Sequence, residues 1–427
     1  MKEEIKVSRL AGGMTVLTDK MPGVRSATIG FFFRAGSRHE PVELNGISHF
    51  IEHTVFKGTA RRTALEIAVE QDRLGGGLDA FTTHEETGFA IKVIDDQLPA
   101  AFDLLSDMLT APEFAPKELR SEQRVIIEEM KMTEDSPEDF LGEVFSESFF
   151  PGHPLGLNIA GSPKTVRSFN PDLTRKYHGE VYNASNLVIA AAGNVDHKTI
   201  VALARKAWRP NGNVGQDGRP QLKTKPPKLA APIIIKQNKA LEQAHMILAT
   251  PFPGAADDRR YAADLLANVI GGGTSSRLWQ KIREERGLAY SVGASGVMYK
   301  DVGVFMVFAG TSPKQTGEVV DISIKELSDI VKNGVRAEEL ELVKHQTVAA
   351  TLLSLEDSAA RAAALAQSEM LYGRQIPVEE TIARVKAVTV EDVHKIARDF
   401  FRTEKIAFAA LGNLKGLKID RERLSLN

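Results

Sequence analysis

The spacing of apolar residues along the first half of the chain changes repeatedly between two periods. Short runs dominated by Val, Ile, Leu, Ala and Phe predict strands at 27–34, 88–93 and 187–192. Stretches with apolar residues three or four positions apart predict amphipathic helices at 47–56, 64–74, 98–109 and 116–132. Strands that alternate with helices in this way predict an α+β fold, a sandwich in which helices pack on a mainly antiparallel sheet.

A segment rich in Gly, Pro and Asn interrupts this pattern near the middle of the chain. It begins at Pro210-Asn211-Gly212-Asn213 and continues to Pro232, with Pro226-Pro227 inside it. Such a density of residues that oppose both helix and strand predicts a linker over 210–232. We therefore expect a first domain over 1–209 and a second domain over 233–427.

The two predicted domains share a degenerate internal repeat. Glu134-Asp135-Ser136 in the first corresponds to Glu356-Asp357-Ser358 in the second. Likewise, Ala191-Ala192-Gly193-Asn194 corresponds to Ala410-Leu411-Gly412-Asn413. The separation between matching positions stays at about 220 residues along the chain. We therefore predict two homologous copies of one α/β-sandwich domain.

Composition excludes several classes of function. The chain has 427 residues, 43% hydrophobic and 26% charged, which suits a globular protein with more than one domain. Its 54 Lys and Arg against 56 Asp and Glu leave a net charge of -2, so nucleic acid is not an expected partner. The absence of Cys removes disulfides and thiolate ligands, and leaves His, Asp and Glu as candidate metal ligands.

The amino-terminal sequence and the hydropathy bear on localisation. The chain begins MKEEIKVSRL, without the basic and apolar regions of a signal peptide. It also has no stretch of about 18 apolar residues that could span a membrane. We expect a cytoplasmic protein without a membrane partner, although a processed mature chain would look the same.

Candidate metal ligands lie on the predicted helix 47–56, within the sequence His49-Phe50-Ile51-Glu52-His53. At about 100° per residue, His49 and His53 lie roughly 40° apart on one face, with Glu52 beside them. Two imidazoles suit Zn²⁺, and a nearby carboxylate can act as general base on a zinc-bound water. H-x-x-E-H is the inverted form of the H-E-x-x-H zinc motif. The alternative is a chance pattern on an amphipathic helix.

A third ligand would have to come from another helix, and residues 122–130 offer the best candidates. Glu122 and Glu129 are seven residues apart and share a face, whereas Glu128 points about 100° away. A carboxylate on the buried side of this helix would be costly unless it were paired or bound to metal. The alternative is that Glu122 and Glu129 form part of a solvated charged stripe.

These residues resemble the pattern of the pitrilysin (insulinase) family of zinc peptidases, in the branch that includes mitochondrial processing peptidase. In that family a Glu follows H-x-x-E-H by about 76 residues, which is the separation between His53 and Glu129. The resemblance implies that His49, His53 and Glu129 bind one Zn²⁺ per chain. It also implies that Glu52 is the general base and that Glu122 is an accompanying carboxylate that orients a ligating His.

Residues 75–82 resemble the edge strand of the same family. The resemblance implies that an extended peptide adds to this edge as a further strand, bound by Ala80, Phe81 and Thr82. The family's usual Asn is Asp79 here, which puts in doubt any contact that the Asn side chain would make.

A second-half segment also resembles the family. Gly271-Gly272-Gly273 precedes Arg283 and Tyr290, which match a substrate-binding Arg and Tyr pair from the half that carries no metal. Taken singly, Arg283 suits a solvated charge on a helix, and Tyr290 suits a core aromatic. Only their place in the larger pattern favours the functional interpretation.

The resemblance implies a zinc-dependent endopeptidase that hydrolyses unfolded peptides or presequence-like segments. The alternative is a non-catalytic structural subunit, like the core proteins of respiratory complexes, whose metal motifs are typically degraded. Family members enclose the site between two halves, each of two domains, so a chain of this length implies a dimer. Because the zinc motif and the Arg and Tyr pair are both present, a homodimer is favoured, and a heterodimer with a homologous chain stays open.

Overall fold

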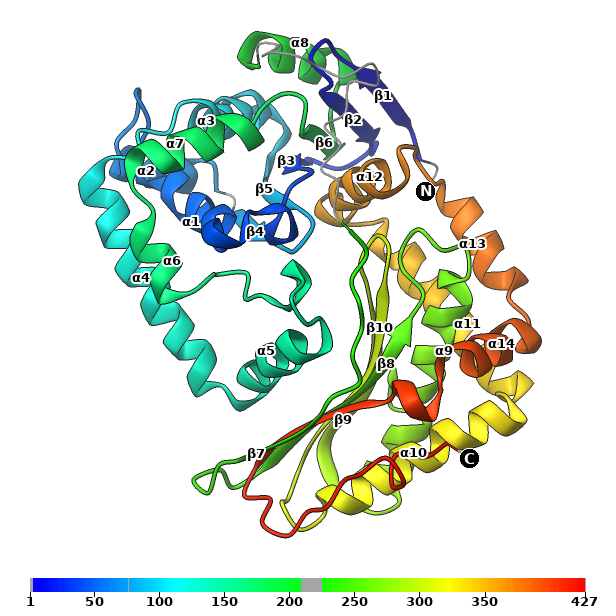
Figure 1. The fold of residues 1–427 in the computed structure, drawn as a ribbon. Helices are drawn as coiled ribbons and strands as arrows, with labels where there is room; N and C mark the ends of the chain where they lie inside the picture. The colour runs from blue at the N-terminus through cyan, green and yellow to red at the C-terminus, as the bar shows by residue number, and fades with distance from the viewer. Residues whose placement is uncertain (1–2, 76, 209–224, 427) are drawn as a thin grey trace. The chain divides into compact units, whose positions relative to one another are not determined.

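The computed structural model describes residues 3–75, 77–208 and 225–426, which form two compact units (Figure 1). Each unit draws on separate stretches of the chain. Unit 1 comprises the described residues within Met1–Lys131, Leu157–Lys225 and Leu352–Pro377, and unit 2 comprises those within Met132–Gly156, Pro226–Thr351 and Val378–Asn427. Most of the predicted linker over 210–232 lies outside the described residues, and the domain limits at 209 and 233 stay a prediction.

Unit 1 is built on a sheet with the strand order β1-β2-β6-β3-β5-β4. β2 and β6 run parallel, and the other neighbouring strands pair antiparallel. β4 lies at one edge of the sheet, with β5 on its inner side. The strands are β1 (Ile5–Arg9), β2 (Thr15–Lys20), β3 (Ser26–Phe33), β4 (Leu78–Thr82), β5 (Thr87–Ile94) and β6 (Leu187–Gly193).

Helices cover both faces of this sheet. On one face, α1 (Ile47–Thr54) and α3 (Leu98–Thr110) join an apolar core that includes Phe50 and Phe102. On the other face, α12 (Ser358–Tyr372) covers β6, β3 and β2 (Figure 1). Because both faces are covered, β6 is a continuous apolar run in which every residue is buried.

Unit 2 repeats this architecture. Its sheet has the order β7-β11-β8-β10-β9, with β7 and β11 parallel and the other neighbours antiparallel. α9, α10 and α14 belong to one core, and α5 packs in a separate core with β8 and β11. The elements are β7 (Ile233–Gln237), β8 (Ala244–Phe252), β9 (Ala289–Met298), β10 (Gly303–Thr311), β11 (Ala407–Gly412), α5 (Pro137–Phe149), α9 (Arg260–Gly271), α10 (Thr316–Asn333) and α14 (Val390–Phe400).

The internal repeat predicted from the sequence is visible in the strand order. β2, β6, β3, β5 and β4 of unit 1 correspond in turn to β7, β11, β8, β10 and β9 of unit 2, including the one parallel pairing in each described sheet. The predicted α+β class, with two homologous sandwiches of helices on mainly antiparallel sheets, is confirmed. The repeat also exchanges two helices, because α5 from the first half packs in unit 2 and α12 from the second half packs in unit 1.

The remaining elements connect or flank these layers. The helices are α2 (Ala64–Arg73), α4 (Pro116–Asp135), α6 (Pro163–Ser168), α7 (Pro171–Val181), α8 (His197–Ala207), α11 (Ala337–Ser354) and α13 (Val378–Ala387). Short 3-10 turns occur at η1 (Ser37–His39), η2 (Val42–Leu44), η3 (Val55–Lys57), η4 (Asp95–Gln97), η5 (Pro154–Gly156) and η7 (Thr403–Lys405). A π-helical segment, η6, spans Trp279–Glu284.

Candidate metal centre

α1 carries the H-x-x-E-H residues, and its two faces differ in burial. Ile47, Phe50 and Ile51 are fully buried in the core of unit 1. Burial of each such side chain contributes about 1.5–3 kcal/mol of stability. His49 and His53 keep 12% and 23% of their side-chain surface exposed. The core contacts therefore hold α1 in place while its imidazoles stay accessible.

α4 brings two carboxylates to the imidazoles of α1. Glu122 and Glu129 both contact His53, which fits their separation of two helical turns. Glu128 instead forms an exposed ion pair with Lys131 at 2.8 Å. Glu122 and Glu129 therefore share the face toward α1, and Glu128 lies off it.

The imidazoles of His49 and His53 and the carboxylate of Glu129 converge on one point. Nε2 of His49 lies 3.8 Å from Oε1 of Glu129, and Nε2 of His53 lies 3.5 Å from Oε2. One ligand atom from each of the three residues falls within 4.8 Å of the others. Two imidazole nitrogens and a carboxylate oxygen at this spacing are a donor set suited to Zn²⁺.

The charge state of His49 also suits a metal, whereas His53 would have to lose its proton when a metal binds. Burial, helped by the neighbouring charge of His53, lowers the pKa of His49 to about 4, so His49 is neutral near neutral pH. Burial also acts to lower the pKa of His53, but the hydrogen bond to Glu122 and the charge of Glu129 raise it overall. Neutral imidazole offers the lone pair that a metal ion needs. The residues present therefore fit a zinc ion.

Glu122 links His53 to a cation. Its Oε2 lies 3.3 Å from Nδ1 of His53, and its Oε1 lies 2.9 Å from the ammonium of Lys57. A carboxylate on the other ring nitrogen fixes the tautomer and the ring orientation of a ligating His. The sequence indicated Glu122 for this place, but it did not indicate an ion pair with Lys57, the last residue of η3.

Glu52 is tied to the edge strand β4. The hydroxyl of Thr82 donates a hydrogen bond of 2.6 Å to Oε2 of Glu52. Burial raises the pKa of Glu52, and the Thr82 hydrogen bond and the charge of His53 oppose this rise. A carboxylate with a raised pKa beside a metal-binding cluster suits general base chemistry.

The other predicted residues of the edge strand lie on its two faces. Ala80 packs against the core of unit 1, and Phe81 packs against Phe32 with ring centroids 6.4 Å apart. Asp79 is exposed, and its charge contributes to raising the pKa of Glu52. The structure therefore brings the strand, through Thr82 and Asp79, next to the predicted general base.

Arg283 and Tyr290 lie together in unit 2, with a third residue that the sequence did not indicate. The guanidinium of Arg283 lies 4.1 Å from the ring centroid of Trp279 and 4.5 Å from that of Tyr290. Its Nη1 also donates to the backbone oxygen of Tyr290 at 2.9 Å. Tyr290 is 80% exposed, so the predicted pair presents a large aromatic surface rather than a core side chain.

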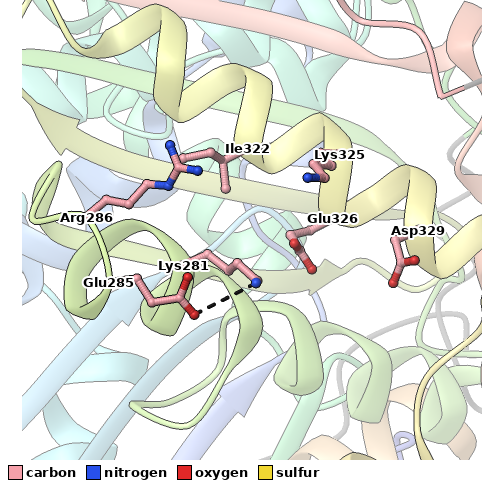
Figure 2. A pocket seen from close by; sticks show the side chains of 7 residues that line it. All are labelled: Lys281, Glu285, Arg286, Ile322, Lys325, Glu326 and Asp329. Atoms are coloured by element: carbon pink, nitrogen blue, oxygen red, sulfur yellow. Dashed lines mark ion pairs between the residues drawn. The ribbon is translucent and has the colours of Figure 1, made fainter.

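A cavity of about 330 Å³ lies elsewhere in unit 2, between η6 and α10 (Figure 2). Three cationic and three anionic side chains and one Ile line it, namely Lys281, Arg286, Lys325, Glu285, Glu326, Asp329 and Ile322. Several of these charges are already paired, as between Lys281 and Glu285 at 3.8 Å. The cavity therefore offers no net charge for a ligand, and it contains none of the predicted site residues.

The family is shown by comparison with known proteins. The model for "Insulinase (Peptidase family M16)" matches residues 15–163, and the model for "Peptidase M16 inactive domain" matches residues 168–347. The chain is 36% identical over 421 residues to an uncharacterized zinc protease of Streptomyces coelicolor, across 98% of this chain and 91% of that protein. The protein belongs to peptidase family M16, the insulinase family.

Solved structures share the fold at lower identity. A protease from Helicobacter pylori has a TM-score of 0.88 and 21% identity, over 96% of this chain and 100% of that one. A chain of Complex III2 from Candida albicans has a TM-score of 0.84 and 21% identity, over 98% of this chain and 99% of that one. Within the described residues, no helix has the length and apolar character needed to cross a membrane.

Proposed function

We propose that this protein is a zinc-dependent endopeptidase that hydrolyses unfolded peptides or presequence-like segments. The observation that carries the proposal is the convergence of His49, His53 and Glu129. Glu52 lies close enough to this cluster for the charges of His53 and Glu129 to act on its pKa. Relatives named zinc proteases support the general class.

His49, His53 and Glu129 would hold one Zn²⁺ per chain. Bound zinc supplies a Lewis acid and lowers the pKa of a bound water toward about 7. Thr82 donates to Oε2 of Glu52, which leaves Oε1 without that contact, and the carboxylate would take a proton from the attacking water. The same carboxyl group then gives the proton to the leaving amine.

The peptide would bind in an extended conformation along the edge of β4. A strand at a sheet edge can pair with an added strand, so backbone hydrogen bonds would supply much of the affinity. Ala80, Phe81 and Thr82 would then bind the substrate next to Glu52. Arg283 and Tyr290 would hold the peptide or stabilise the developing oxyanion, and the exposed ring of Tyr290 is open to such a contact.

Assembly and location form part of the same proposal. We propose that the protein acts in the cytoplasm. We also propose that it forms a homodimer, because one chain carries both the zinc ligands and the Arg283 and Tyr290 pair. A heterodimer with a homologous chain is the alternative arrangement. The peptide substrate is the expected partner, rather than nucleic acid or a membrane.

A non-catalytic structural subunit is the competing function, and the fold shared with a chain of Complex III2 is compatible with it. The complete donor set of His49, His53 and Glu129, together with Glu52, favours the peptidase. A subunit with a purely structural role would not need two partly exposed imidazoles beside a carboxylate.

The test measures zinc content and cleavage of a random peptide library by the purified protein. We expect one zinc per chain in both the wild type and Glu52→Gln, with cleavage by the variant reduced by about 100-fold or more. Near-normal cleavage by zinc-loaded Glu52→Gln would remove Glu52 from its role. A wild-type chain that binds no zinc and cleaves nothing would favour the structural subunit.

A further inference from the structure

The amino-terminal end of α1 begins without a capping side chain of its own. The N-cap residue is Gly46, which has a φ of 97° and no side chain to accept hydrogen bonds from the first turn. A Cβ at this position would lie 2.4 Å from the backbone oxygen of Ala160, so glycine is required here. The first backbone N–H groups of α1 therefore need acceptors from elsewhere.

Glu40, six residues upstream of the N-cap, supplies one acceptor to the first turn of α1 and another to the N-cap itself. Its Oε1 accepts from the backbone N–H of Ser48 at 2.8 Å, and its Oε2 accepts from the N–H of Gly46 at 2.7 Å. Oε2 also lies 3.3 Å from the side-chain amide of Asn45. Glu40 is only 6% exposed, so its carboxylate is almost wholly committed to this end of the helix.

The environment of Glu40 acts on its ionised form in two opposite directions. Burial raises its pKa to about 7, while the hydrogen bonds from Ser48 and Gly46 act to lower it. Ser48 has a further polar contact, since its hydroxyl lies 3.3 Å from that of Tyr177. A buried carboxylate at a helix N-terminus is stabilised by the N–H donors and by the positive end of the helix dipole.

The two proposed histidine ligands differ in whether a side-chain contact holds the imidazole ring in place. Glu122 contacts Nδ1 of His53, whereas Nδ1 of His49 is buried and has no hydrogen-bond partner within the described part of the chain. A ligating His normally uses its other nitrogen for such a contact. The position of His49 therefore depends on its backbone, and His49 directly follows Ser48, whose N–H Glu40 binds.

We propose that Glu40 is a positioning residue for the metal centre, which fixes the first turn of α1 and thereby places the imidazole of His49. In this arrangement the two ligands of α1 are held from opposite directions. Glu122 holds the ring of His53 through a side-chain contact, and Glu40 holds the backbone that bears His49. This inference rests on the proposed zinc site.

The experiment compares Glu40→Gln and Glu40→Asp with Glu43→Gln, an exposed carboxylate in the same segment. Gln presents an NH₂ group to one of the two backbone donors, and Asp keeps the charge but shortens the reach. Zinc affinity is measured by competition with a chelator, and ligand geometry is measured by visible absorption of the Co²⁺-loaded protein. Thermal unfolding shows that each variant is folded. Measurements at about pH 8.5, above the pKa of Glu40, keep the wild-type carboxylate ionised.

We expect both Glu40 variants to lose zinc affinity by about tenfold or more and to change the Co²⁺ spectrum, with Glu43→Gln within about twofold of the wild type. A folded Glu40 variant with wild-type zinc affinity and an unchanged Co²⁺ spectrum overturns the proposal, even if its melting temperature falls. If Glu40→Gln does not fold, the zinc affinity and the Co²⁺ spectrum of Glu40→Asp decide whether the proposal holds. A wild-type chain that binds no zinc removes the proposed function itself, whereas zinc binding unaffected by the Glu40 variants removes only this role.

Discussion

The hydroxyl of Thr82 lies 2.6 Å from Oε2 of Glu52, and this hydrogen bond joins the edge strand β4 to the helix α1 that bears the histidines. Both residues sit in unit 1, so the strand proposed to bind the peptide also orients the proposed general base. Substrate binding at this edge and proton transfer would therefore be coupled through one side-chain contact.

Thr82→Val should lower kcat by about tenfold or more with zinc content unchanged. The substitution keeps the side-chain volume but removes the donor, and a hydrogen bond to a charged group contributes roughly 1.5–3 kcal/mol. Thr82→Ser, which keeps the hydroxyl, is the matched control and should stay close to the wild type. Steady-state peptide hydrolysis checks this, and equal kcat values for Thr82→Val and Thr82→Ser would show that the hydrogen bond does not serve catalysis.

Glu129→Gln should weaken zinc binding much more than Glu128→Gln does. Glu129 lies within 4 Å of both imidazoles, whereas Glu128 is paired with Lys131 on an exposed face. Loss of a ligand should exceed the roughly 10–100-fold effect that is usual for a partner behind a ligand. Competition with a chelator gives the two zinc affinities, and equal losses in the two variants would mean that Glu129 is not a ligand.

His178 should make unit 1 less stable in mild acid. Burial lowers its pKa to about 4, while the hydrogen bond of Nε2 to the backbone oxygen of Leu109 opposes this shift, so the folded protein holds His178 neutral. The unfolded chain binds the proton below its ordinary pKa of about 6.5. The stability that His178 contributes is therefore complete above that pH and is lost as the pH falls toward the folded pKa.

Comparison of the wild type with His178→Gln isolates this contribution. Gln keeps a donor for the Leu109 carbonyl but does not titrate. Between about pH 7.5 and pH 5 the wild type should lose about 2 kcal/mol more unfolding free energy than the variant does. Urea unfolding of both proteins across this range provides the measurement, and parallel pH profiles would contradict it.

Much of the fold was predictable because local periodicity determines it. The strands predicted at 27–34, 88–93 and 187–192 correspond to β3, β5 and β6, and the helix predicted at 47–56 corresponds to α1 with η3. The exchange of α5 and α12 between the units was not predictable, since it depends on which sheet face each helix covers. Equivalent helices of the two repeats have similar apolar faces. The hydrophobic pattern therefore does not show on which of the two sheets each helix packs.

Part of the candidate site was likewise predictable from the sequence, and part was not. His49, Glu52 and His53 stand out because they share one helical face within five residues of sequence. Glu40 and Trp279 could not be found in this way, because their partners come close only in the folded chain. Glu40 binds two backbone N–H groups, and Trp279 packs against the guanidinium of Arg283. Buried carboxylates and aromatic residues of that kind have no spacing that distinguishes them from ordinary core residues.

The homodimer proposal predicts that two inactive variants should complement each other. If the zinc ligands of one chain work with the Arg283 and Tyr290 pair of another, Glu52→Gln and Tyr290→Phe should each be nearly inactive alone. After mixing and subunit exchange, about half the dimers should contain one chain of each kind. Each mixed dimer would have one site with both functional residues, so about a quarter of the wild-type sites should return.

Activity of the mixture over time measures this recovery, and subunit exchange is followed separately with differently tagged chains. A mixture of Glu52→Gln with Glu129→Gln is the matched control, because both changes fall in the same zinc cluster and no mixed dimer gains an intact one. Recovery in the first mixture and none in the control would support sites shared between two copies of the chain. If exchange occurs and neither mixture regains activity, each site is completed within one chain or by a different partner, and the homodimer with shared sites is wrong.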